Sequence, residues 1–255
     1  PICIGGAQVA KVKVTTELVG SGTGATGPSW EGLILAAGCA VANGSASMTE
    51  SPGTWASSMT NLTFGHYVDG RKRGARGVSL NMTMKGESGK QVMVEWEGSG
   101  GWIATTNVAN ITPTFLTSPI PPRLQSATFT VDTVQYISRG FEFGLGNVIA
   151  VRRDGGSPNG VHSTAVTDRD PYLEFDVEAN STKDWDADYA AGATAAASIV
   201  IGAVAGNIWT LTIPKMQQSQ APEKIDIDGV AGYKLHFGLL RNAVAGDDSF
   251  SLVQN

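Results

Sequence analysis

The sequence is poor in charged residues and in cysteine, and both shortages narrow what the protein can be. Only 16% of its 255 residues are charged, and 18 Lys and Arg against 23 Asp and Glu give a net charge of −5. An acidic chain lacks the basic face with which sequence-independent nucleic-acid binders contact phosphates. So little charged surface also indicates that partners cover part of the chain.

The two cysteines, Cys3 and Cys39, are too few for a disulfide framework and lack metal-site spacing. We interpret them as reduced core residues of a cytoplasmic product. The first residues contain no long apolar core, so no secretion signal is expected. The longest apolar stretch, residues 190–206, is slightly short for a membrane span and is diluted by Gly, Ala and Thr. We expect the end of a helix running into a buried strand there.

Residues 22–27 match the G-x-G-x-x-G pattern of dinucleotide-binding proteins. In such a site the helix begins inside the motif, so that its N-terminal N–H groups face the pyrophosphate. Here Pro28 follows the last glycine, and proline suits the first position of a helix. The second strand ending in an acidic residue is also missing. We therefore interpret the motif as a mobile glycine linker before a short helix, which Pro28 opens and Gly38 closes.

The chain has abundant glycine, with 32 residues. Thr and Val recur in alternating runs, so the composition favours β structure. Asp69-Gly70 and residues 86–89 are turn signals between three strand-like runs. Residues 207–214 alternate and are expected to stop at Pro214, and Asp226 and Asp228 alternate along a strand into an Asp-Gly turn. A second short helix is expected at 183–192, where Asp184 and Asp186 favour its N-terminus.

Similarity between two parts of the sequence predicts a tandem duplication of one β unit. A proline begins each of two similar stretches, residues 122–147 and 222–242, and each ends in F-G-L and a nearby Asn. Upstream of each lies a strand, a glycine turn and a second strand. We therefore expect an N-terminal arm and glycine-rich loop at 1–27, a first unit at 28–147 and a second unit at 148–255.

The sequence contains no complete catalytic, nucleotide-binding or metal-binding motif. Asp184, Asp186 and Asp188 begin like a calcium loop, but its sixth and twelfth positions are Tyr189 and Ala195. The P-loop and nucleophile-elbow patterns are incomplete or missing, and the three histidines are isolated. The sequence thus predicts no catalytic residues, no metal ligands, no cofactor and no enzymatic turnover.

One basic cluster stands out, at residues 69–77. It lacks the interleaved aromatic residues of a nucleic-acid patch. We interpret it as an exposed hairpin that is solvated or pressed against the acidic surface of a partner, such as a neighbouring subunit or the next ring of an assembly. Its candidate contact residues are Asp69, Arg71, Lys72, Arg73 and Arg76.

Ordered pieces of the chain resemble the tail tube proteins, or major tail proteins, of long-tailed bacteriophages and related prophages, in particular the type with a duplicated tube domain. The pieces run from about residue 28 to 252, and it is their order that carries the resemblance. They are "PSWEGLILAAG", "YVDGRKRGARGVSL", "EWEGSGG" to "PIPPRLQSATFTV", "FEFGLGNVIAVRRDGG", "TDRDPYLEFDVEA", "GAVAGNIWTLTIPKMQ" and "AGDDSFSL".

The resemblance implies a mainly β fold of two tandem tail-tube-like sandwich or barrel units with short flanking helices. It implies a virion structural protein of a siphovirus, assembled in the cytoplasm of the bacterial host and located in the virion tail. Such subunits form stacked rings around a hollow tube through which genomic DNA passes without tight binding. The implied partners are further copies of the chain, a tape-measure protein and tail-terminator or tail-tip proteins, with no membrane.

Single-domain subunits of this family commonly form rings of six. If each chain carries two units, three chains supply six units, so we expect trimeric rings. Rings of six chains are the alternative. In this interpretation the glycine loop orders on assembly, and an acidic wall repels the DNA phosphates. A different class stays open, a β-sandwich module that binds glycans or decorates a surface. The residues that could stack on sugars in that case are Trp55, Trp96, Trp102 and Trp209.

Overall fold

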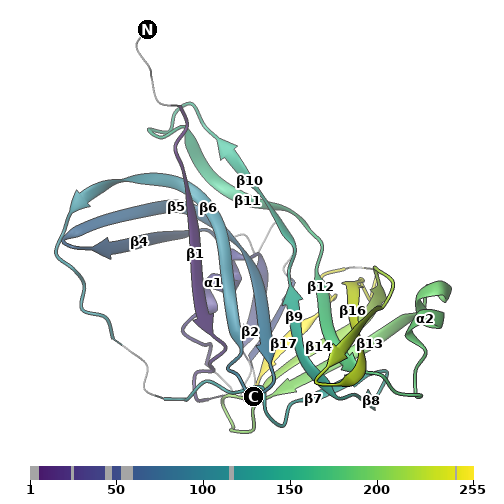
Figure 1. Cartoon of the computed structure of the whole chain (residues 1–255). Coiled ribbons are helices and arrows are strands. Elements are labelled where there is room, and N and C mark those ends of the chain that lie inside the picture. Colours follow the sequence, from purple (N-terminus) through teal and green to yellow (C-terminus); the bar gives the residue numbers. More distant parts are fainter. Residues whose placement is uncertain (1–5, 24–25, 44–47, 53–59, 115–117, 245) are drawn as a thin grey trace.

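A computed structural model describes residues 6–23, 26–43, 48–52, 60–114, 118–244 and 246–255 (Figure 1). The described part of the chain is mainly β, as the composition predicts, and contains two short helices. Fifteen of the described strands join in one sheet, and β10 and β11 form a separate pair. The central path of the large sheet runs β1-β6-β5-β9-β12-β16-β14-β13-β7-β8.

In the first half of the chain, β1 precedes the helix α1 in the sequence and the other strands follow it. Their bounds are β1 Val9–Glu17, β2 Cys39–Asn43, β3 Met48–Pro52, β4 Leu62–Val68, β5 Arg71–Glu87, β6 Met93–Asn107, β7 Thr128–Val131, β8 Val134–Gln135 and β9 Ser138–Gly144. The later strands are β10 Asn147–Arg153, β11 Val161–Arg169, β12 Tyr172–Glu178, β13 Thr194–Ile201, β14 Trp209–Gln218, β15 Glu223–Ile227, β16 Val230–Leu239 and β17 Ser251–Gln254. All of the strand pairings in the described residues are antiparallel.

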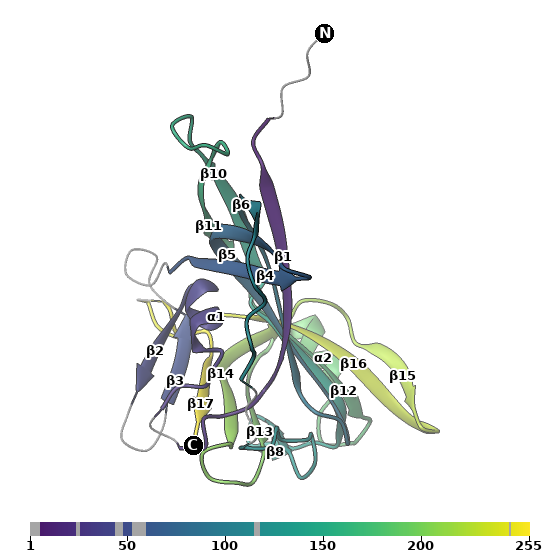
Figure 2. The same ribbon diagram turned by 90° about the vertical axis from the view of Figure 1, so that its left-hand side faces the viewer.

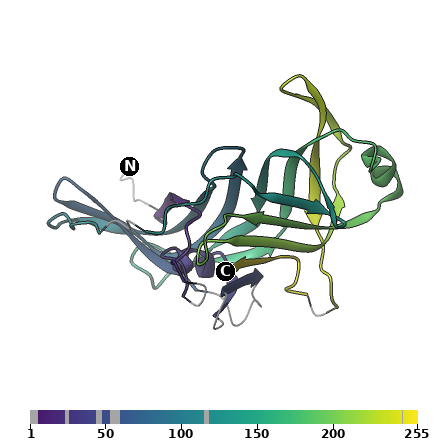
Figure 3. The same ribbon diagram turned by 90° about the horizontal axis from the view of Figure 1, so that it is seen from below.

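The sheet curves strongly, so that one of its faces encloses the core (Figures 1 and 3). Aromatic contacts join strands that are far apart along the sheet. Phe129 of β7 meets Phe141 of β9 at 5.7 Å between ring centroids. Trp30 stacks on Trp209 of β14 at 5.3 Å and also contacts Trp96 of β6 at 5.8 Å. Burial of such large rings makes this contact region a major stabilising element of the fold.

Both predicted helices are present. The first, α1 (Glu31–Ala36), is shorter than expected, because the chain between Pro28 and Trp30 forms only a turn. Gly38 follows it with a positive φ of 76°, as predicted for the closing glycine. The second, α2 (Trp185–Ala191), begins at Asp184, whose carboxylate accepts a hydrogen bond from the Ala187 N–H. Among the described residues, no helix has the length and apolar character needed to cross a membrane.

The turns also follow the predictions. Asp69 and Gly70 have φ values of 49° and 71° and join β4 to β5. Asp228 and Gly229 do the same between β15 and β16, with φ values of 53° and 88°. Both residues of each turn lie in the left-handed region, which matches a two-residue hairpin and the Asp-Gly sequence.

The two F-G-L stretches lie on opposite sides of one strand, β12. Phe143 of β9 and Phe237 of β16 both face Leu173 in register. In the same way Gly144 and Gly238 both face Tyr172. The stretches therefore occupy matching positions within a continuous sheet. The division into units at 28–147 and 148–255, and the duplication itself, remain predictions from the sequence.

The expected strand end at Pro214 is wrong, because β14 continues to Gln218. The register of the β13–β14 pair shifts between Ala195 and Ala197, which leaves Pro214 in a bulge. Pro214 also lies between the part of β14 that pairs with β17 and the part that pairs with β16. Its missing N–H therefore costs no ladder hydrogen bond, and proline is tolerated at such positions.

The interpretation of the glycine loop as a mobile linker is wrong for its described first part. The Gly20 N–H donates to the side-chain oxygen of Asn207 at 2.7 Å, and the Asn207 amide donates to the Ile120 carbonyl at 2.7 Å. The buried amide of Gln254 donates to Ser21 and to the Thr23 carbonyl. The loop is thus held by the C-terminal strand, and residues 24–25 lie outside the described residues.

This network gives a test of stability. Asn207→Ala removes two hydrogen bonds and leaves the Gly20 N–H and the Ile120 carbonyl without their partner. The Gly20 N–H is buried, whereas Ile120 is exposed and water can reach its carbonyl. An unsatisfied buried group costs about 1–3 kcal/mol, so we expect the free energy of unfolding to fall by about that amount. Chemical denaturation measures this loss. The exposed Asn242→Ala is the control and should change stability by less than about 0.5 kcal/mol; equal effects of both substitutions would contradict the role of Asn207.

Candidate functional site

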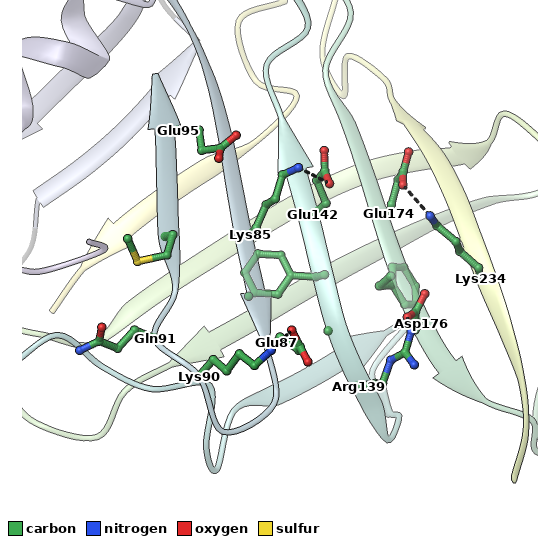
Figure 4. Close-up of a pocket in the computed structure, with 15 residues that line it drawn as sticks. Lys85, Glu87, Lys90, Gln91, Glu95, Arg139, Glu142, Glu174, Asp176 and Lys234 are labelled. Atoms are coloured by element: carbon green, nitrogen blue, oxygen red, sulfur yellow. Dashed lines mark hydrogen bonds and ion pairs between the residues drawn. The ribbon is translucent and has the colours of Figure 1, made fainter. Parts of the chain in front are cut away.

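A polar cleft lies on the outer face of the sheet, across β5, β6, β9, β12 and β16 (Figure 4). Its volume is about 640 Å³. Along these strands the apolar side chains alternate with charged ones, so that the buried residues Met84, Phe143 and Leu235 point to the core. The charged residues on the other face line the cleft.

Each cation that lines the cleft has an acidic partner from the same face. Lys85 Nζ lies 3.0 Å from Glu142 Oε2, and Lys234 Nζ lies 3.5 Å from Glu174 Oε2. The remaining pairs are Lys90 with Glu87 at 2.7 Å and Arg139 with Asp176 at 2.5 Å. Because these pairs are partly or largely exposed to solvent, each contributes little to stability. Their main effect is to leave the face close to neutral, with no lysine or arginine of the cleft lacking a carboxylate.

Two carboxylates face each other at the centre of the cleft. Glu142 of β9 and Glu174 of β12 are directly opposite in register, a placement that is destabilising for like charges. Each has its own cation on the outer side, Lys85 for Glu142 and Lys234 for Glu174. His236 Nδ1 also lies 3.0 Å from Glu174 Oε1. The row is therefore balanced by charges on both flanking strands.

Tyr172 is held at one edge of this row. Its hydroxyl donates to Glu142 Oε1 at 2.9 Å. Burial, followed by this hydrogen bond and the charge of Glu142, raises the pKa of Tyr172 to about 12. The phenol therefore stays neutral and keeps donating to the carboxylate throughout the physiological range.

The predicted hairpin contact residues are only partly together. Asp69, Arg71, Lys72 and Arg73 lie at the β4–β5 turn and the start of β5, where Lys72 lies over the Tyr67 ring at 5.4 Å. Arg76 differs, because its guanidinium binds within the chain to Ser157 at 2.5 Å and to Asn159 at 3.1 Å. These bonds hold the β10–β11 loop against β5. An intersubunit role for the hairpin remains a prediction.

The tryptophans offered for glycan stacking differ in accessibility. Trp96 and Trp209 are fully buried, whereas Trp102 is 38% exposed. Trp55 lies outside the described residues. Trp102 is therefore the one described member of this set with a usable ring face. Cys39 is buried, whereas Cys3 lies outside the described residues. In the part of the chain that the structure describes, His, Cys, Asp and Glu form no group of three or more suited to a metal ion.

Comparison with known proteins finds no family model that matches the sequence and no curated protein with significant similarity to it. The resemblance to tail tube proteins therefore remains an expectation from the residues.

Sequence reasoning missed the cleft. A signal was present, since Lys85 and Glu87, Arg139 and Glu142, and Glu174 and Asp176 each occur on strand-like runs. The sequence shows His236 as isolated, but in the structure it lies next to Glu174 of β12, which is 62 residues earlier in the chain. Proximity of that kind depends on strand order, which local patterns do not specify.

The tyrosine gives a test of the cleft geometry. We expect one of the five tyrosines to ionise near pH 12 in the folded protein, and Tyr172→Phe to remove that transition. Glu142→Gln should move it to lower pH, because the carboxylate acceptor is lost while burial remains. Spectrophotometric titration of the phenolate measures both shifts. The exposed Tyr189→Phe is the control, and a late transition that survives Tyr172→Phe would contradict the assignment.

The same shift has a consequence for stability. The folded pKa of about 12 lies above the value of about 10 in an unfolded chain. On raising the pH the unfolded chain therefore loses this proton first. The contribution of Tyr172 to stability is complete below about pH 10 and is lost between about pH 10 and 12. Denaturation curves of the wild type and Tyr172→Phe should converge over that interval.

Proposed function

We propose that the chain is a structural subunit that self-associates into stacked rings and forms the tail tube of a long-tailed bacteriophage, through which DNA passes. The observation that carries the proposal is the charged sheet face that lines the cleft of Figure 4, in which each lysine and arginine of the cleft is ion-paired. Such a wall stays hydrated but offers no unpaired cation to a phosphate. It suits a surface along which DNA moves and is not retained.

The open edges of the sheet support self-association. Within the described residues β1 pairs only with β6, and β15 pairs only with β16. Unpaired strand edges favour contacts with further chains. In the proposed assembly these contacts join the sheets of neighbouring subunits around the lumen. The low charged content of the chain (16%) fits a surface that is largely covered in such an assembly.

The first test is the assembly itself. We expect electron microscopy of the purified protein to show rings or tubes, with trimeric rings of pseudo-sixfold outline if the two halves of the chain are equivalent units. Rings with six chains would contradict the trimer but keep the tube. A protein that stays monomeric at high concentration and binds a glycan would instead favour the binding-module alternative.

The second test addresses the wall. Glu87→Lys with Glu95→Lys should leave rings intact but make assembled tubes bind short duplex DNA, because both changes create cations with no partner. The binding should weaken as salt rises, since phosphate contacts release counterions. A pull-down of labelled DNA with tubes measures the effect.

A matched control places the same charge change elsewhere, with Asp154→Lys and Asp168→Lys on and beside the β10–β11 pair. If the control retains DNA as well as the wall variant does, the cleft does not face the lumen.

A further inference from the structure

An apolar groove of about 480 Å³ lies at one end of the molecule, over β1, β4, β5 and β6. Val14 of β1 is opposite the buried Trp96 in register, so Ala10, Val12 and Val14 lie on the same face as the core. Trp102 lies six residues beyond Trp96 on β6 and shares this face. The core-facing side of the sheet thus continues past the core and becomes the floor of an open groove, with Phe64 at its side.

The groove has a cationic rim. His66 and Arg73 line it and, by register, share the face of Phe64 and Ala75. Lys11 and Lys13 alternate with Val12 and lie on the other face of β1, where Lys13 is paired with Glu97 at 2.6 Å. Arg73 forms no ion pair within the described residues, in contrast to the cations of the polar cleft. A ligand that matches this groove combines an aromatic or aliphatic side chain with a carboxylate.

The opposite end of the molecule presents that combination. Figures 1 and 3 place the β4–β5 hairpin at one end of the long axis and α2 near the other. Asp186 and Tyr189 are both exposed on α2, Tyr189 by 41%, and their spacing of three residues puts them on one helix face.

Contacts with the rest of the chain fix the position of α2. The buried Trp185 anchors it, and the Gln218 amide donates to the Trp185 carbonyl at 3.1 Å. Asp188 is paired with Lys183 at 3.2 Å, whereas Asp186 forms no ion pair within the described residues. Asp186 is therefore the carboxylate of this face that is available to a partner.

We propose that α2 of a second copy docks in the groove over β1, β4, β5 and β6, with Tyr189 on the apolar floor and Asp186 at the rim beside Arg73. This inference rests on the proposed self-assembly and names the contact that performs it. The two surfaces differ and lie at opposite ends, so the contact is head-to-tail. Such a contact leaves one groove and one α2 free in each dimer, and the chain of contacts continues until a ring closes. Charge attraction across the contact weakens as salt rises.

Two variants test the contact. The groove variant carries Trp102→Ala and Arg73→Glu, and the helix variant carries Asp186→Lys and Tyr189→Ala. Each lacks one of the two surfaces, so we expect each alone to remain monomeric in analytical ultracentrifugation. An equimolar mixture contains one intact groove and one intact α2, and we expect it to form a 1:1 dimer and no larger species.

The test needs a check that the variants fold and a control for the charge reversal. Circular dichroism and thermal melts establish that both variants fold, and Arg152→Glu with Arg153→Glu on β10 is the matched reversal, which should assemble like the wild type. A mixture that stays monomeric, or variants that assemble normally, would overturn the contact. If both variants and the wild type form tubes, the α2–groove contact is wrong but the proposed function stands. A wild type that never forms rings, beside variants that dimerise when mixed, would support the contact and contradict the tube.

Discussion

The structure depends on the alternation of buried and charged side chains along the parts of β5, β6, β9, β12 and β16 that line the polar cleft. A strand exposes successive side chains on opposite faces, so this pattern makes one face of the sheet a core and the other a charged wall. A slip of one residue would exchange the two faces. The buried Phe143 and Phe237, both opposite Leu173, hold the register in which the charges of the outer face meet their partners.

The charged wall and the apolar groove are two consequences of that alternation. Where α1, β14 and β17 cover the inner face, it is the core, and Trp30 fills the space between Trp96 and Trp209. Where β1 and β6 run beyond this cover, the same face is open, and Trp102 is left 38% exposed. On the outer face the opposed Glu142 and Glu174 are tolerated because flanking strands supply Lys85 and Lys234. Assembly contacts and a non-adhesive wall thus use different faces of one sheet.

The parts of the fold that were predictable are local in sequence. Asp-Gly pairs require left-handed backbone at adjacent residues, which identified the turns at Asp69 and Asp228. The acidic residues Asp184 and Asp186, which favour a helix N-terminus, indicated the start of α2. Pro214 shows the limit of this reasoning. A proline normally ends a strand, but here neighbouring strands leave its position without a ladder hydrogen bond, and nothing near it in the sequence indicates so.

By itself the sequence determined the mainly β class, the alternation, the turns and the helix caps, because each depends on the conformational preferences of a few adjacent residues. Only the tertiary structure decided which strands are neighbours. That choice brings Glu174 to His236, pairs Arg76 with the β10–β11 loop, and joins the glycine loop to Gln254 at the end of the chain. These contacts link residues far apart in sequence, and they form only when burial of the shared core repays the entropy of closing long loops.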